Sequence, residues 1–351
     1  MSALTLGFIP LTDAAPLIVA KARGFFADEG LDVTLSREAS WATVRDKVAV
    51  GALDGAHMLA PMTLAATAGQ AGVSPLIAPL SLGANSAAVT LSKALVGVLG
   101  ADVSSPSMAA AGLAQRIAEG RAGKQPPMTF AVVFPHSMHN YLLRYWLAGA
   151  GIDPDRDVRI VVTPPPRMVE QLSAGEVDGI CVGAPWNTVA ARADLGRLVF
   201  GASRFWPGAP DKVLGVTEAF ASQDPARLQA VLRALVRAQA WADAPENRTE
   251  LATLLAEPEH VGAERQAIIA ALEAGLVFQK DGAALPRLEH ARWLLGQMRR
   301  WGQIGRGGDD ESLAARVYRP DLALEAMAAA GLATDPLRPV GPLFDGTGFS
   351  A

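Results

Sequence analysis

Residues 4–35 read LTLGFIPLTDAAPLIVAKARGFFADEGLDVTL, and this stretch decides the fold class. Leu4–Ile9 is a short apolar run typical of a buried strand, and Asp13–Ala27 has the periodicity of a helix. Asp13 stands where an N-cap residue is preferred. Leu31–Leu35 is the next apolar run. A strand, a helix and a second strand in this order predict a parallel sheet covered by helices on both faces.

The same alternation continues along the chain. Short apolar runs bounded by turn residues predict further strands at Gly55–Ala60, Ala88–Leu91, Thr129–Phe134, Val158–Thr163, Val177–Val182 and Leu198–Ala202. From Pro225 onwards the pattern is mostly helical, beginning with Pro225–Ala242. No period of 20–50 residues recurs, which excludes solenoids and propellers. The sequence predicts two α/β lobes followed by a helical C-terminal part.

Composition narrows the class of function. The 351 residues are 50% hydrophobic and 19% charged, which is typical of a globular chain rather than a disordered one. The net charge is −4 and no long run of Lys or Arg occurs, so we expect no direct nucleic-acid partner. One cysteine, Cys181, forms no intrachain disulfide. The five histidines lack the spacing of a structural zinc site, so we expect no metal and no cofactor.

The N-terminus reads MSALTLGFIP, without a basic segment, an apolar signal core or a small-residue cleavage site. Charged residues interrupt every alanine-rich stretch before 18 apolar residues accumulate, so we expect no membrane span. These features predict a cytoplasmic protein. A chain from which a signal peptide has been removed would begin in the same way, and that alternative stays open.

Polar and aromatic residues gather in the loops that follow the predicted strands. In α/β folds the ligand sits at the carboxyl ends of the strands, where helix N-termini also direct backbone N–H groups. The loops carry few carboxylates and many hydrogen-bond donors, which favours a cleft for a small anion. The residues concerned are Thr12, Trp41, Asn85, His136, His139, Trp186 and Asn187.

Each of these residues also has a purely structural interpretation. His136 and His139 share a helix face at i, i+3, and one of them can instead be a cap or a packed side chain. Trp41 and Trp186 fit a cleft wall or a core equally well. Lys212 precedes an apolar strand, where lysines are usually solvated, and Cys181 has the apolar neighbours of a buried thiol. The residues alone leave two classes open: an anion-binding protein, or an enzyme that uses His and Lys.

A set of motifs adds a resemblance to a known family. The stretches are LGFIPLTDAAPLIVAK (6–21), WATVRDK (41–47), DGAHMLAPM (54–62), RYWLA (144–148), GIDP (151–154) and VGAPWN (182–187). In this order they resemble the nitrate- and bicarbonate-binding proteins of ABC transporters (NrtA/CmpA-like). The resemblance implies a type II periplasmic-binding-protein fold with two Rossmann-like lobes around a central cleft. Lobe 1 is then discontinuous, with residues 1–92 and 201–351, and lobe 2 comprises residues 93–200.

The resemblance also implies a ligand site and no catalytic residue. Trp41, His139, Gly183 and Lys212 match the family's nitrate contacts, and Thr12, Asn85, Ala87, His136 and Trp186 are secondary cleft residues. Lys212 stands where bicarbonate-binding relatives have a calcium-binding glutamate, which favours nitrate or nitrite. We expect Lys212 to supply the charge that balances the anion, with no carboxylate nearby. Ser86-Ala87 and Ala184 depart from the transporters' usual Gly-Gln and Glu, so ligand contacts are expected to differ.

The expected cytoplasmic location points to one branch of this family, the nitrate/nitrite sensors of the NasS type. The resemblance then implies a protein partner, the ANTAR-domain antiterminator NasT, which the sensor releases when the anion binds, so that nitrate-assimilation genes are expressed. The first alternative is the substrate-binding component of a nitrate ABC transporter. The alternative from another class is a small-molecule biosynthetic enzyme, because enzymes of thiamin-pyrimidine and menaquinone synthesis use the same fold.

Overall fold

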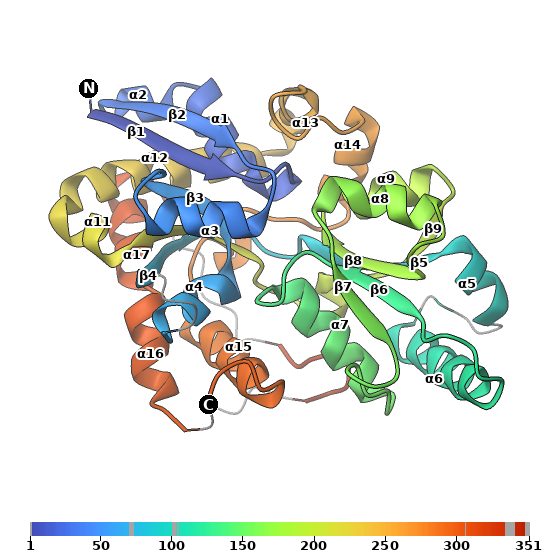
Figure 1. The fold of residues 1–351 in the computed structure, drawn as a ribbon. Coiled ribbons are helices and arrows are strands. Elements are labelled where there is room, and N and C mark those ends of the chain that lie inside the picture. The colour runs from blue at the N-terminus through green and yellow to red at the C-terminus, as the bar shows by residue number, and fades with distance from the viewer. Residues whose placement is uncertain are drawn as a thin grey trace.

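The computed structural model describes residues 2–69, 74–99, 103, 105–305, 307–333 and 341–347. Two five-stranded sheets form within these residues, and each is flanked by helices (Figure 1). The strand order is β2-β1-β3-β10-β4 in the first sheet and β7-β6-β8-β5-β9 in the second. We call the parts built on them the first-sheet half and the second-sheet half.

The first sheet is mixed rather than parallel. β1 (Ser2–Phe8) pairs in parallel with β2 (Leu31–Arg37) and β3 (Gly55–Leu59). β10 (Lys212–Thr217) runs antiparallel between β3 and β4 (Leu76–Ser81). The prediction of an all-parallel sheet is therefore wrong, because β10 enters from a distant part of the chain and not through a β–α–β crossover.

The second sheet is mixed as well. β6 (Thr129–Val132) pairs in parallel with β7 (Arg159–Val162) and β8 (Gly179–Gly183). β5 (Ala87–Ser92) lies antiparallel between β8 and β9 (Gly196–Gly201). β5, which the predicted division assigns to lobe 1, is hydrogen-bonded within the second sheet. The division into lobes, 1–92 and 201–351 against 93–200, stays a prediction.

Helices cover both sheets. The second-sheet half has α5 Lys93–Leu99, α6 Pro106–Ala122, α7 Met138–Gly149, α8 Pro165–Ser173, α9 Trp186–Arg192 and α10 Ala202–Phe205. The first-sheet half begins with η1 Thr12–Ala14, α1 Ala15–Ala22, α2 Phe25–Asp28, α3 Trp41–Ala49 and α4 Ala60–Thr67. It continues with α11 Glu218–Gln223, α12 Pro225–Asp243, η3 Pro245–Asn247, α13 Arg248–Ala256, α14 Arg265–Glu273, η4 Lys280–Gly282, α15 Leu288–Arg300, α16 Asp310–Val317 and α17 Pro320–Ala329.

Local sequence explains where the helices begin. The Ser40 hydroxyl accepts from Thr43 N–H at the start of α3, and Ser137 does the same for Asn140 at the start of α7. Each cap satisfies one of the N–H groups that the first helical turn leaves unpaired. These caps place Trp41 and His139 in the first turns of their helices, and both side chains point inward and are buried.

The C-terminal helices join the two halves. α15 packs against both α4 and α7, and the Tyr141 hydroxyl on α7 donates to Gln303 just after α15. The apolar residues of α4, α7 and α15 belong to one core cluster, which includes Met62, Trp146 and Leu294. Within the part of the chain that the structure describes, no helix combines the length and apolar character needed to span a bilayer.

Candidate functional site

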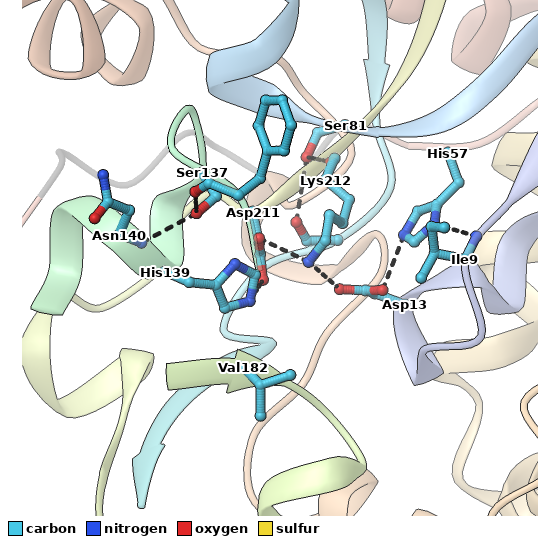
Figure 2. Close-up of polar contacts among 12 residues, drawn as sticks. Ile9, Asp13, His57, Ser81, Ser137, His139, Asn140, Val182, Asp211 and Lys212 are labelled. Carbon is cyan, nitrogen blue, oxygen red and sulfur yellow. Dashed lines mark hydrogen bonds and ion pairs between the residues drawn. The ribbon is translucent and has the colours of Figure 1, made fainter. Parts of the chain in front are cut away.

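Lys212, the first residue of β10, is the centre of the candidate site. Its side chain is completely buried, and Nζ lies 2.9 Å from Asp13 Oδ2 and 2.7 Å from Asp211 Oδ1 (Figure 2). Burial alone lowers the pKa of Lys212, but the Asp13 and Asp211 carboxylates outweigh it, so the pKa is raised and the ammonium stays charged. A fixed positive charge therefore lies between the two sheets.

Asp13 corrects two predictions made from the sequence. It lies inside η1 and makes no capping hydrogen bond; its carboxylate is turned to Lys212 and His57 instead. The expectation that no carboxylate approaches Lys212 is also wrong. A fully buried ammonium needs paired oxygens, since an isolated charge in the interior is very costly. Asp211 was visible as the neighbour of Lys212 in sequence, whereas Asp13 is 199 residues away.

His57 from β3 orients Asp13 from the other side. Its Nε2 lies 2.9 Å from Asp13 Oδ1, while Ile9 N–H approaches Nδ1 at 3.5 Å, which places the ring proton on Nε2. Burial raises the pKa of Asp13, but Lys212 and His57 overcome that effect and bring it well below the usual range. Asp13 is therefore an ionised carboxylate held by Lys212 and His57. Sequence reasoning missed His57, although it lies in the quoted DGAHMLAPM stretch.

The second-sheet half supplies the opposite wall. His139 is fully buried, and its Nε2 faces Asp211 Oδ2 at 3.5 Å. Burial lowers the pKa of His139 well below its usual value, and Lys212 adds to that effect against the opposing Asp13, so the imidazole is neutral. A Cβ at Gly183 would come within 3.2 Å of Ser86 Oγ and 3.5 Å of His139 Nε2. The missing side chain of Gly183 allows Ser86 and His139 to lie close to the backbone at this point.

Several buried polar atoms around Lys212 have no hydrogen-bond partner among the described residues. They include Trp41 Nε1, Thr12 Oγ1, Ser86 Oγ and both ring nitrogens of His139. The Trp41 ring also lies 5.7 Å from Lys212 Nζ and 5.4 Å from the His57 ring. Buried groups without partners are uncommon in native proteins, and an indole N–H can only donate. The arrangement indicates a small enclosed ligand that presents hydrogen-bond acceptors.

The other predicted cleft residues take different places. Asn85 donates through Nδ2 to Gly275 O and accepts from Gly208 N–H, and it lines a separate cavity of about 360 Å³. His136 is half-buried beside Phe134, with 6.1 Å between the ring centroids; burial and Arg45 lower its pKa to about 4. The two remaining predicted cleft residues, Ala87 and Asn187, make structural contacts. Ala87 pairs with Gly183 across the strands, and Asn187 holds the β8–α9 turn through Val182 O.

Direct hydrogen bonds close the two halves over Lys212. Trp186 Nε1 donates to Pro10 O at 3.0 Å, and Thr12 N–H donates to Ala184 O at 2.8 Å. Farther out, Arg192 on α9 pairs with Glu264 next to α14. Thr12 and Trp186 thus hold the two halves together next to the buried site.

Trp186→Phe tests this contact. Phenylalanine keeps most of the packing but removes the hydrogen bond to Pro10, so the closed form loses about 0.5–1.5 kcal/mol. We expect ligand affinity to fall about threefold to tenfold in titration calorimetry. Trp301→Phe is the matched control, because the Trp301 indole donates within its own segment to Gln297. Equal affinities for the Trp186→Phe and wild-type proteins would mean that this bond does not stabilise the ligand-bound form.

Comparison with known proteins agrees with this architecture. Residues 1–256 match the model of the NMT1-like family. The chain belongs to the NMT1-like family. Over 99% of its length it resembles the crystal structure of the periplasmic nitrate-binding protein NrtA from Synechocystis, with a TM-score of 0.90, 30% identity and 94% of that chain covered. The predicted α/β fold of the periplasmic-binding-protein type is therefore confirmed.

Two sequence relatives place this NMT1-like chain more narrowly. It is 32% identical to the nitrate/nitrite binding protein NrtA of Synechococcus elongatus, over 99% of this chain and 83% of the relative. It is 38% identical to the nitrate import ATP-binding protein NrtC of Synechocystis, over 92% of this chain. The match spans only 49% of NrtC, about half the length of that relative. The first is named as a binding protein and the second as an import protein.

Proposed function

We propose that this protein binds nitrate or nitrite in the enclosed site around Lys212, as the substrate-binding component of an ABC transporter. The observation that carries the proposal is the set of buried, unpartnered donors next to a buried ammonium, with Trp41 Nε1 foremost. Nitrate is small and planar and has three acceptor oxygens. Its oxygens can accept from the indole N–H of Trp41 and from an imidazole N–H of His139, and Lys212 supplies a positive charge nearby.

The relatives favour the transporter interpretation over the sensor interpretation. Their names describe nitrate binding and nitrate import, and the similarity to NrtA extends over almost the whole chain. The NasS-type sensor role, the partner NasT and the cytoplasmic location stay predictions that rest on the resemblance alone. We therefore adopt the binding function and assign the chain to transport.

Isothermal titration of the ligand-free protein with nitrate, nitrite and bicarbonate tests the proposal. We expect saturable binding of nitrate or nitrite with one site per chain, and little heat from bicarbonate. If neither nitrate nor nitrite binds at any pH at which the protein is folded, the proposed function is overturned.

Trp41→Phe tests the individual contact. Phenylalanine keeps the aromatic packing against His57 but removes the only donor of the indole, a loss of about 1 kcal/mol or more when the acceptor is an anion. We expect nitrate affinity to fall about fivefold to tenfold in the same titration. Trp146→Phe is the control, since that indole donates to Pro106 O at 2.7 Å within the second-sheet half. If both variants bind nitrate like the wild type, Trp41 does not contact the anion.

A further inference from the structure

Asp211 is the residue of this site that the proposed function does not yet explain. Its side chain is 1% exposed, with Oδ1 at 2.7 Å from Lys212 Nζ and Oδ2 at 3.5 Å from His139 Nε2 (Figure 2). An anion-binding site normally avoids carboxylates, because like charges repel strongly in a dry interior. Here the carboxylate of Asp211 is the second one in the site, and it lies next to His139 and Lys212.

The charges of the buried cluster do not favour an added anion. The ammonium of Lys212 is already balanced by Asp13, which His57 keeps ionised. If Asp211 is also ionised, two carboxylates face the one ammonium before any ligand enters. The titratable groups that face Asp211 are Lys212 on β10, Asp13 on η1, His57 on β3, His139 on α7 and Cys181 on β8.

None of the other groups is placed to supply the missing positive charge. His139 is neutral for the reasons given above, and the Cys181 thiol has its pKa raised by burial and by Asp211. The imidazole of His57 is committed to Asp13 and Ile9 N–H. A proton on Asp211 removes one of the two negative charges and leaves the ion pair between Asp13 and Lys212 intact.

We propose that Asp211 takes up one proton from solvent when an acceptor-only anion binds, and that its carboxyl group then donates a hydrogen bond to that anion. The proposal rests on the proposed function, because it concerns the same site. The balance is simple: the anion brings one negative charge, solvent supplies one proton to Oδ2, and Oδ1 remains against Lys212. Asp211 is thus a specificity-determining residue, since its protonated carboxyl group donates a hydrogen bond to an anion that offers only acceptors.

The titration behaviour of Asp211 agrees with this geometry. Burial, with a smaller contribution from Asp13, raises the pKa of Asp211 to about 6, although Lys212 opposes the rise. In the free protein near neutral pH the carboxylate is mostly ionised, so the proton has to be taken up on binding. Because the bound anion raises this pKa further, nitrate affinity should be constant below about pH 6 and fall up to about tenfold per pH unit above it.

Titration calorimetry of the wild-type protein with nitrate tests the proposal directly. Measured at about pH 7.5 in buffers of different ionisation enthalpy, the heat should vary with buffer so as to report about one proton taken up per nitrate. Binding with no proton uptake, and with affinity independent of pH, would overturn the proposal while leaving the proposed function intact. No binding of nitrate or nitrite at any pH would overturn the proposed function itself.

Two variants assign the proton to a residue. In Asp211→Asn the amide is a permanent neutral donor, so proton uptake should vanish and affinity at about pH 7 should rise about tenfold. In His139→Gln uptake should persist although nitrate binds more weakly. Asp157→Asn is the control, since Asp157 is buried but pairs with Arg121 in the second-sheet half. Loss of uptake in His139→Gln and its retention in Asp211→Asn would overturn the assignment to Asp211.

Discussion

We expect Lys212→Met to abolish measurable nitrate binding and to lower the free energy of unfolding by about 3–5 kcal/mol. Methionine has a similar shape, so the packing of β10 is kept and the loss is electrostatic. Without the ammonium, the buried carboxylates of Asp13 and Asp211 lose the positive charge that they share. One of the two carboxylates would then have to take up a proton. Titration calorimetry measures the first effect and urea denaturation measures the second.

Lys93→Met is the matched control for this experiment. Lys93 also forms an ion pair with an aspartate, Asp194, but its side chain is 67% exposed. Surface pairs of this kind contribute about 0–1 kcal/mol, so stability and nitrate affinity should both be close to wild type. Tight nitrate binding by a folded Lys212→Met protein would show that the anion sits elsewhere and would contradict the site assignment.

We expect Gly183→Ala to weaken nitrate binding about a hundredfold, equivalent to about 2.7 kcal/mol, with a smaller effect on stability. The added Cβ would meet Ser86 Oγ at 3.2 Å and both His139 Nε2 and Leu11 Cδ1 at 3.5 Å, so it would displace side chains at the edge of the proposed anion site. Gly183 does not adopt a left-handed backbone conformation, so alanine causes no strain in β8 itself. The effect is therefore a steric one on the ligand space, and calorimetric titration with nitrate measures it.

Gly201→Ala is the control for Gly183→Ala. The two glycines end the strands on either side of β5, where Gly183 pairs with Ala87 and Gly201 pairs with Ala88. A Cβ at Gly201 meets nothing closer than Ser203 Oγ at 3.9 Å. We expect wild-type affinity from this variant. An equal loss of affinity in both would mean that the effect comes from the sheet and not from the site.

Much of the fold could be predicted from the sequence, because helices and strands are local. The predicted helix Pro225–Ala242 differs by one residue from α12, where Asp224 caps the first turn and a proline follows it. The predicted strand Leu31–Leu35 begins at the first residue of β2. Apolar periodicity and turn chemistry act within about ten residues, so they are readable without knowledge of the partner elements.

Strand direction and several elements were not predictable in this way. β10 and β5 run antiparallel inside sheets whose local rhythm predicts parallel pairing. β4 is not among the predicted strands either, although its residues are all buried. A strand's own sequence does not encode which neighbour it pairs with, since pairing depends on the path of the whole chain.

The candidate site also has one part that the sequence predicts and another that only the tertiary structure shows. The family motifs predict Trp41, His139, Gly183 and Lys212 as ligand contacts, and this stays a prediction. In the structure Trp41 lies near Lys212, and His139 lies near Asp211 and Gly183. Only the tertiary structure decided what that ammonium is bound to. Asp13 and His57 reach the site from other strands and turns, and Asp211 is turned inward by the start of β10. The physical reason is burial: in water each of these groups would be solvated independently, but within the folded interior every charge must find its partner in space.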